Sequence, residues 1–164
     1  MDKIDALKDC RFYIDLDGTV FEWHDNGNFM APHYFRHLPE HKNMVEACKI
    51  LKNLGLQISF ATAVISEEAI EDKRLNLNDI GLENIPMIAI PYGENKSEFL
   101  PGKLRILLDD HTPNCNKFDG KAIKFINAIN HKQGKWTGPC IDYKMTGIEI
   151  ATTLITQAYN ECIK

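Results

Sequence analysis

Short apolar, β-prone segments alternate along this chain with segments of helical periodicity. Residues 12–14 (Phe-Tyr-Ile) form a short apolar run flanked by charged residues, which predicts a buried strand. Similar runs predict four further strands, at residues 56–62, 86–90, 103–110 and 122–126. The predicted strands are therefore spread along the chain.

Two segments between or after these strands have the spacing of amphipathic helices. In residues 42–54, apolar residues recur every three or four positions, and Gly55 follows where a helix commonly ends. Residues 147–163 show the same spacing. A further helix is predicted to begin at Glu67, because the hydroxyl of Ser66 can accept a hydrogen bond from its first turn.

Strands that alternate with helices favour the α/β class and a mostly parallel sheet covered on both faces. We therefore predict a three-layer Rossmann-like fold in which residues 1–164 form a single domain. One segment departs from the alternation, because residues 21–40 are rich in aromatic residues, His, Asn, Gly and Pro. It is predicted to form a flap, a minimal cap insertion over the carboxyl edge of the sheet, where open α/β sheets bind ligands.

The amino-acid composition narrows the possible partners of the protein and its possible location in the cell. The 164 residues carry a net charge of −4, which disfavours a nucleic-acid partner, since such partners usually require a basic surface. The five cysteines are odd in number and include no Cys-x-x-Cys pair, so reduced thiols are expected. No secretory signal is recognisable, and no apolar run approaches the ~20 residues of a membrane span. We expect a soluble, cytoplasmic protein.

Four carboxylates follow two of the predicted strands. Asp15 and Asp17 come directly after the first strand, and Asp109 and Asp110 end the fourth. Because parallel strands end at one edge of the sheet, these side chains should meet in one crevice. Carboxylates packed together repel unless a cation lies among them, and oxygen ligands favour Mg²⁺ over zinc or copper. The sequence therefore predicts a Mg²⁺ site at this edge.

Two hydrogen-bond donors are expected beside these carboxylates. Thr62 ends the second predicted strand, and Lys96 lies in the loop before the fourth. A hydroxyl and an ammonium group that face a metal–carboxylate cluster suit a phosphoryl group, whose oxygens need donors and positive charge. The pattern therefore indicates phosphoryl chemistry.

These motifs resemble those of the haloacid-dehalogenase-like (HAD) superfamily of phosphohydrolases. The resemblance rests on DLDGT (residues 15–19) after an apolar strand, a strand-terminal threonine, a later lysine and an apolar strand that ends in two aspartates. It covers residues 12–118 in the family's chain order. Within the superfamily, YFRHLPEHKNMVEACKIL (residues 34–51) followed by SFATAV (residues 59–64) most resembles the C-type 5′-nucleotidase, or deoxyribonucleotidase, branch.

The resemblance implies a two-step phosphoryl transfer. Asp15 would be the nucleophile that forms an aspartyl-phosphate. Asp17 would be the general acid for the leaving oxygen and then the base for the hydrolytic water. Thr62 and Ala63 would bind the phosphoryl group, and Lys96 would neutralise charge on that group and on Asp15.

The resemblance also implies the metal ligands. Mg²⁺ would be held by Asp15, the backbone carbonyl of Asp17 and Asp109, with Asp110 binding directly or through water. Gly18 would permit the tight turn that aims Asp17 at the site. Because neighbouring side chains on a strand alternate, one of Asp109 and Asp110 should point away from the crevice, and Asp109 is preferred as the ligand.

Alternatives remain for several of these residues. Lys103 competes with Lys96 for the family lysine, although it begins the strand whose far end carries the site. Thr62 could instead be a helix cap, and Asp15 and Asp17 could form a strand-end turn through their own hydrogen bonds.

Histidines and aromatic residues in or next to the flap raise two further questions. His33, His37 and His41 are four residues apart, as on one helix face, but Pro39 interrupts such a helix, which argues against a metal site.

Phe21 and Trp23 follow the DLDGT turn, and packing is one role open to them. If the flap is extended, both rings point the same way and could contact the substrate by stacking on a nucleobase.

The function expected from the sequence is that of a Mg²⁺-dependent phosphatase for a small phosphomonoester, favouring a nucleotide. The flap is too short for a large cap, so the crevice should be open to a bulky substrate or to a second subunit of a homodimer. Two other functions stay open: a phosphatase for a polynucleotide end, and a catalytically idle phosphate-binding protein. The intact pair of Asp15 and Asp17 counts against the idle protein, because binding alone needs no acid–base group.

Overall fold

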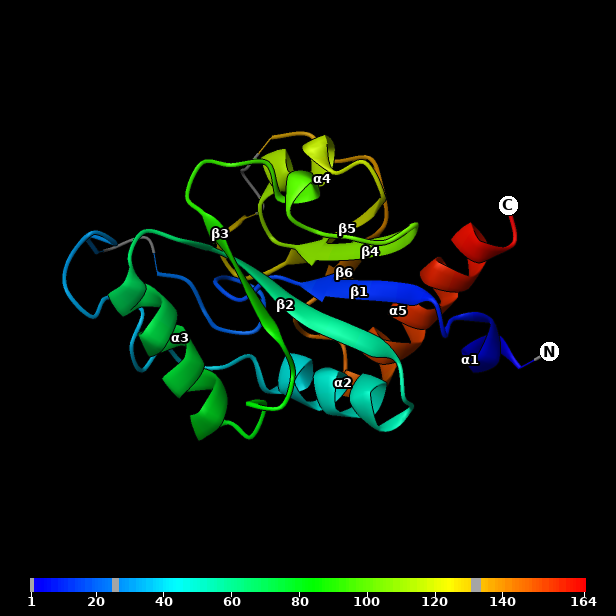
Figure 1. Cartoon of the computed structure of the whole chain (residues 1–164), viewed down its shortest axis with the longest axis horizontal. Coiled ribbons are helices and arrows are strands. Elements are labelled where there is room, and N and C mark those ends of the chain that lie inside the picture. Colours follow the sequence, from blue (N-terminus) through cyan, green and yellow to red (C-terminus); the bar gives the residue numbers. More distant parts are fainter. Residues whose placement is uncertain (1, 25–26, 131–133) are drawn as a thin grey trace.

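One parallel sheet organises the protein. The computed structural model describes residues 2–24, 27–130 and 134–164. Within these ranges, six strands pair in parallel in the order β3-β2-β1-β4-β5-β6 (Figure 1). The strands are β1 (Cys10–Ile14), β2 (Gln57–Val64), β3 (Met87–Pro91), β4 (Leu104–Asp109), β5 (Lys121–Ile126) and β6 (Cys140–Asp142).

Helices lie on both faces of the sheet. In Figure 1, α2 and α3 lie below the sheet and α4 lies above it, while α5 begins beside α2 and rises past the right-hand end of β1. Residues of α5 share the larger core with those of α2. The protein therefore has three layers, the Rossmann-like α/β arrangement predicted from the sequence. The helices are α1 (Lys3–Ala6), α2 (Lys42–Asn53), α3 (Glu67–Asp79), the 3₁₀ helix η1 (Lys96–Glu98), α4 (Thr112–Lys117) and α5 (Gly147–Cys162).

The two faces of β1 bury side chains in different clusters. Phe12 and Ile14 belong to the larger core, which includes apolar residues of α2 and α5. Tyr13, between them, belongs to a smaller cluster with Cys115 of α4. Side chains alternate along a strand, so a fully apolar run can supply both layers of core. Three consecutive buried residues, 12–14, are therefore needed in this strand.

The predicted elements are largely confirmed. All five predicted strands are present, as are the helices after residues 41 and 146. The hydroxyl of Ser66 accepts a hydrogen bond from the backbone N–H of Ala69, so it caps α3 as predicted. The elements α1, α4, η1 and β6 were not predicted, and each spans only three to six residues. Such short elements leave too few positions for a periodic pattern.

The sheet reverses its strand order next to β1. From β1 the chain builds outward through β2 to β3, and it then returns to place β4 on the other side of β1. The carboxyl ends of β1 and β4 are adjacent, since Ile14 pairs with Leu108. A crevice forms at such a reversal because the two following loops leave in opposite directions.

The flap, residues 21–40, follows this edge. Phe21 forms an isolated antiparallel bridge with Glu40, which joins the two ends of the flap beside the sheet. Between these ends the chain contains turns and bends at residues 27 and 29–37. The described flap residues therefore include no regular helix or strand.

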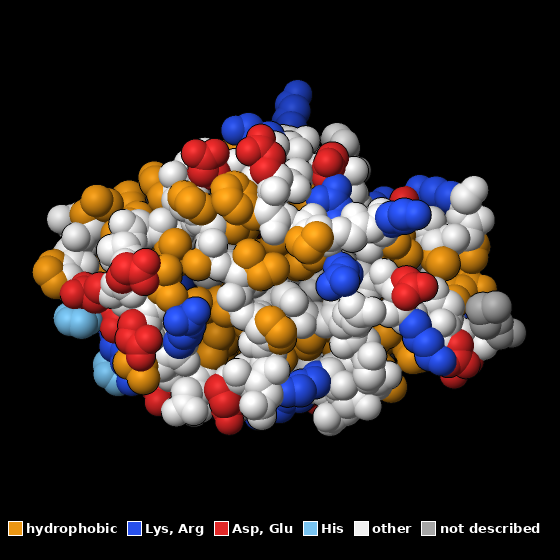
Figure 2. All heavy atoms as spheres, in the orientation of Figure 1, with side chains coloured by type: hydrophobic (Ala, Val, Ile, Leu, Met, Phe, Trp, Pro, Cys, Tyr) orange, Lys and Arg blue, Asp and Glu red, His pale blue; other side chains and the backbone are white. Residues whose placement is uncertain are grey.

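The structure also bears on what the sequence led us to expect of the cysteines, the surface charge and membrane-spanning segments. All five cysteines are free, and Cys10, Cys48 and Cys115 are buried. On the face shown in Figure 2, acidic and basic side chains are interspersed. None of the helices within the described residues is both long and apolar enough to cross a membrane.

Candidate active site

A cavity of about 300 Å³ opens at the carboxyl edge of the sheet, beside the reversal of strand order. All four aspartates predicted to meet in one crevice line it. The lining residues are Asp15, Asp17, Trp23, Phe29, Phe35, Ala63, Ile65, Tyr92, Lys96, Asp109, Asp110, His111 and Asn114. The cavity therefore has both acidic and aromatic walls.

Lys96 bridges two of the carboxylates. Its Nζ donates to Asp15 Oδ1 and Asp109 Oδ2, each at 2.7 Å, and to the carbonyl oxygen of Ala61 at 2.8 Å. Lys103 is exposed and precedes β4, whose other end carries the site. Of the two lysines considered from the sequence, Lys96 is the one that reaches the carboxylates.

Three buried carboxylates could hold a metal ion. One oxygen from each of Asp15, Asp109 and Asp110 lies within 4.8 Å of the others. Lys96 is the ammonium group hydrogen-bonded to this cluster, so negative charge is in excess when all three acids are ionised. A divalent cation would offset that excess, and an all-oxygen set of ligands suits a hard cation.

The pKa shifts agree with a site of excess negative charge. Burial, followed by the charge of Asp109, raises the pKa of Asp15 to about 7, although Lys96 opposes the shift. Burial and the charges of Asp15 and Asp109 raise the pKa of Asp110 well above its ordinary value. Burial lowers the pKa of Lys96, but the charges of Asp109 and Asp15 outweigh burial and raise it overall. A bound cation would favour the ionised form of both carboxyls.

Asp109 and Asp110 both face the cavity, so the expectation that one would point away is wrong. Strand β4 ends at Asp109. Asp110 lies past that end, where strand alternation no longer fixes the direction of a side chain. The Asp109 carboxylate is held firmly, because it also accepts hydrogen bonds from the backbone of His111 (2.8 Å) and the side chain of Asn114 (3.1 Å).

Gly18 packs directly against Asp110. A Cβ at position 18 would lie 2.1 Å from Asp110 Oδ2, and the φ of Gly18 is +85°. Asn127, which sequence analysis did not single out, fixes both residues from the end of β5: its Nδ2 donates to Gly18 O at 2.8 Å and to Asp110 Oδ2 at 3.2 Å. Glycine is therefore required here for a turn and for close approach.

Lys73 of α3 contacts Asp17 and was missed by sequence analysis. Its Nζ donates to Asp17 Oδ2 at 2.6 Å, and the lysine side chain is only 2% exposed. A sequence signal existed, because polar Asp72, Lys73 and Asn76 stand between Ala69 and Leu77, at the spacing that apolar residues take on a packed helix face. Lysines are usually exposed, so a lysine at such a position does not by itself indicate burial.

Of Thr62 and Ala63, which were expected to bind phosphate, only Ala63 lies at the cavity surface. Ala63 lines the cavity, whereas Thr62 is fully buried and is not part of the lining. The hydroxyl of Thr62 instead accepts a hydrogen bond from Lys73 at 2.9 Å. Thr62 is also not a helix cap, because β2 continues to Val64 and Ser66 caps α3.

Phe21 and Trp23 do not share a location. Phe21 is 2% exposed within the main core and does not line the cavity, so of the two roles left open for it, packing is the one that the structure shows. Trp23 does line the cavity. The bridge from Phe21 to Glu40 joins the two ends of the flap and holds residue 21 beside the sheet.

Aromatic rings form the apolar part of the cavity lining, which we call the aromatic wall. The ring centroids of Trp23 and Phe35 are 6.0 Å apart, and those of Phe29 and Tyr92 are 5.6 Å apart. All four rings line the cavity. Such surfaces can stack on a planar group.

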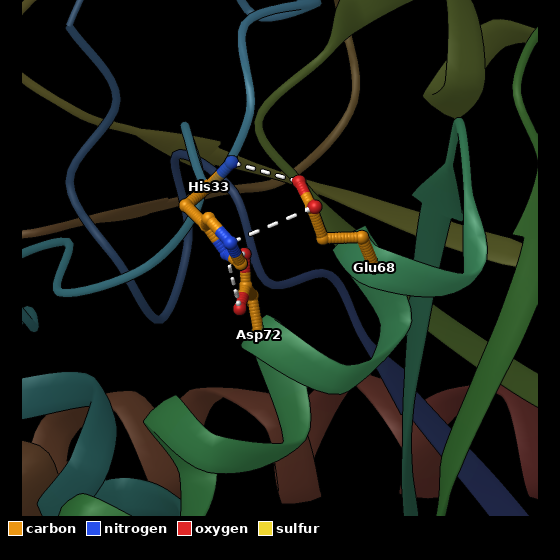
Figure 3. Close-up of side chains that lie close together, drawn as sticks. All are labelled: His33, Glu68 and Asp72. Atoms are coloured by element: carbon orange, nitrogen blue, oxygen red, sulfur yellow. Dashed lines mark hydrogen bonds and ion pairs between the residues drawn. The ribbon is translucent and has the colours of Figure 1, made fainter.

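The three histidines of equal spacing are not brought together. His33 lies against α3, where Nδ1 is 2.9 Å from Asp72 Oδ2 and the backbone N–H donates to Glu68 Oε1 at 2.8 Å (Figure 3). His41 is buried and its Nδ1 is 2.7 Å from the carbonyl oxygen of Thr19.

His37 interrupts the helical spacing through its backbone. Its φ is +62°, and its backbone N–H donates to Asn76 Oδ1 at 3.0 Å. The helix that would align the histidines does not form, as Pro39 indicated.

The chain matches no protein-family model, and no curated protein is similar to it. Among solved structures, it is similar to DsGPDH of Dunaliella salina, with 17% identity and a TM-score of 0.42. The alignment covers 74% of this chain and 25% of that chain, so the protein spans about a quarter of the matched chain's length. A likeness this distant carries no argument about activity.

Proposed function

We propose that this protein is a Mg²⁺-dependent phosphomonoester hydrolase of the HAD type that acts through an aspartyl-phosphate. One observation carries the proposal. The buried carboxylates of Asp15, Asp109 and Asp110 lie close together with the ammonium group of Lys96, and all four residues line one cavity. A phosphate-binding site alone would favour donors over three carboxylates, because carboxylates repel a phosphoryl group unless a cation lies between them.

The proposed reaction has two steps. A carboxylate oxygen of Asp15 attacks phosphorus, the bond to the leaving oxygen breaks, and Asp17 gives that oxygen its proton. Asp17 then takes a proton from the water that attacks phosphorus, the bond between phosphorus and Asp15 breaks, and phosphate leaves. Bound Mg²⁺, held by the Asp15, Asp109 and Asp110 carboxylates, would offset negative charge on the phosphoryl oxygens.

The position of Lys96 supports a role in keeping Asp15 reactive. Its ammonium group holds one oxygen of Asp15, which fixes the orientation of the carboxylate and opposes its protonation. Lys96 also adds positive charge at the floor of the cavity, where a phosphoryl group would lie.

The aromatic wall favours a substrate with a planar leaving group, and we propose a nucleoside monophosphate. Trp23, Phe29, Phe35 and Tyr92 line the same cavity as the catalytic carboxylates. A base that stacks on one of these rings would leave its phosphate free to enter the acidic floor.

The proposal is tested by a screen of phosphomonoesters with Mg²⁺ or EDTA, comparing wild type, Asp15→Asn and Asp9→Asn. Asp9 is exposed, so its variant controls for the loss of one carboxylate. Wild type and Asp9→Asn should release phosphate only with Mg²⁺, and Asp15→Asn should be inactive. Acid-quenched wild type should carry one added phosphoryl group on Asp15 by mass spectrometry. Turnover by Asp15→Asn, or no turnover of any ester by wild type, would contradict the proposal.

A further inference from the structure

Lys73 donates all of its ammonium protons to the protein. The group has three, and Nζ has three acceptors: Asp17 Oδ2 at 2.6 Å, Ala63 O at 2.7 Å and Thr62 Oγ1 at 2.9 Å. The residue is 1% exposed and does not line the cavity. Lys73 therefore has no proton left for a substrate, which excludes it as a direct phosphate ligand.

Lys73 and Lys96 make related contacts with β2. Phe60 is the last residue of β2 paired with β1, and beyond it Lys96 hydrogen-bonds the carbonyl of Ala61 while Lys73 hydrogen-bonds that of Ala63. Each lysine thus donates one proton to a backbone carbonyl of the strand. Lys96 holds Asp15, and Lys73 holds Asp17.

The hydrogen bond from Lys73 fixes only one carboxylate oxygen of Asp17. Oδ2 is held by Lys73, and within the described part of the chain no hydrogen bond reaches Oδ1. The Asp17 side chain is 18% exposed and lines the cavity. A carboxylate held by one oxygen keeps the other available for proton transfer in a fixed direction.

The flap secures the helix that carries Lys73. On α3, Asp72 contacts His33 (Figure 3). Asn76 of the same helix donates to the carbonyl of Phe35 at 2.6 Å. The ring of Phe35 lies 4.4 Å from Lys73 Nζ, so the flap also covers the ammonium group. These contacts shield the ammonium group of Lys73 from water and limit movement of the lysine.

We propose that Lys73 is a positioning residue that orients Asp17 for acid–base chemistry, and that it takes no part in binding the phosphoryl group. The proposal rests on the proposed function. Loss of Lys73 would let the Asp17 side chain rotate away from the leaving oxygen, and small misplacements of catalytic groups are costly.

The test compares Lys73→Met and Lys73→Arg with Lys103→Met, an exposed lysine that serves as the control. The kcat/KM value reports the first irreversible step, and protonation by Asp17 matters most for a poor leaving group. Lys73→Met should lower kcat/KM for an alkyl phosphate about 10- to 100-fold and for p-nitrophenyl phosphate less than about threefold. Lys73→Arg, which keeps the charge and donors, should recover most of the difference.

Two further measurements separate positioning from other roles. The inhibition constant of inorganic phosphate should be unchanged in Lys73→Met, and a rise would overturn the proposal by showing phosphate contact. Adding Lys73→Met to Asp17→Asn should cause no further loss, because Lys73 acts through Asp17. Losses that multiply in the double variant would indicate a merely structural role.

The outcomes also distinguish this proposal from the proposed function. Wild-type turnover that Asp15→Asn abolishes supports the phosphatase whatever Lys73 does, and equal loss on both esters in Lys73→Met would then overturn the positioning role alone. Wild type without turnover overturns both. If Lys73→Met does not fold by circular dichroism, Lys73→Gln replaces it, because the amide keeps donors for Thr62 and Ala63 while losing the charge.

Discussion

The carboxylate of Asp110 lies where a side chain at Gly18 would have to be. A Cβ on residue 18 would approach Asp110 Oδ2 to 2.1 Å, so any substitution there must move a proposed metal ligand. The Asp-Leu-Asp-Gly-Thr turn and the end of β4 are thus fitted to each other across the site.

Gly18→Ala is expected to lower the free energy of unfolding by more than the strain of its backbone conformation alone explains. Alanine at positive φ costs about 1–2 kcal/mol, and at position 18 the displacement of Asp110 adds to this. Gly55→Ala is the matched control, since Gly55 has φ +77° and nothing within 4 Å of a Cβ. Urea unfolding should show the larger loss for Gly18→Ala, and stabilisation by Mg²⁺ should disappear only in that variant. Equal losses and equal Mg²⁺ responses would contradict this account.

Activity should follow the chemistry of a hard cation. EDTA should abolish turnover, Mg²⁺ should restore it, and Ca²⁺ should bind but support little turnover because its larger, looser coordination shell misplaces the nucleophile. Asp110→Asn should raise the Mg²⁺ concentration for half-maximal activity at least about tenfold, since it removes a ligand charge. Full activity in EDTA would rule out the metal site, and the exposed variant Asp119→Asn should leave the Mg²⁺ requirement unchanged.

Trp23→Ala should impair substrates that contain a nucleobase. Stacking of a base on an aromatic ring contributes about 1–3 kcal/mol, which corresponds to roughly 5- to 150-fold in KM. The KM of a nucleoside monophosphate should rise by that factor, while the KM of ribose 5-phosphate, which lacks the base, should stay the same.

Phe21→Leu is the control for general damage to the flap. Phe21 belongs to the core, so its variant should lose stability without changing the ratio of the two KM values. If Trp23→Ala also leaves that ratio unchanged, Trp23 packs the flap and does not contact a base.

The contact between His33 and Asp72 should weaken with rising pH. The hydrogen bond and charge of Asp72, with the charge of Glu68, raise the pKa of His33 above its ordinary value. A raised pKa in the folded state means that the stabilisation is complete below about pH 6.5, the unfolded pKa, and is lost as pH rises through the folded value.

Thermal unfolding of wild type and His33→Gln at pH 5.5 and pH 9 tests this sign. The difference in melting temperature should be larger at the lower pH. His24→Gln, which removes an exposed histidine 3.9 Å from Glu22, should show a smaller dependence. A difference that grows toward pH 9 would contradict the assigned charge state.

Local patterns in the sequence were sufficient for the order of five strands and the three longest helices, and for the acids of the site. An apolar run such as residues 12–14 must be buried, and a carboxylate that follows a parallel strand must lie at the carboxyl edge. Asp15, Asp17 and Asp109 could therefore be placed from the chain alone. Lys96 could also be favoured over Lys103, because position relative to a strand fixes which edge a residue can reach.

Only tertiary structure determined which polar residues are buried and which way loop side chains point. Lys73 lies on a helix whose polar positions resemble a solvated surface, and its burial depends on β2 and the flap, which are distant in sequence. Phe21 is buried in the core and Trp23 lines the cavity, although alternation along an extended chain would give their side chains the same direction. Asp110 turns inward because β4 has already ended. Periodicity fixes directions within regular elements, whereas outside them the packing of distant segments decides.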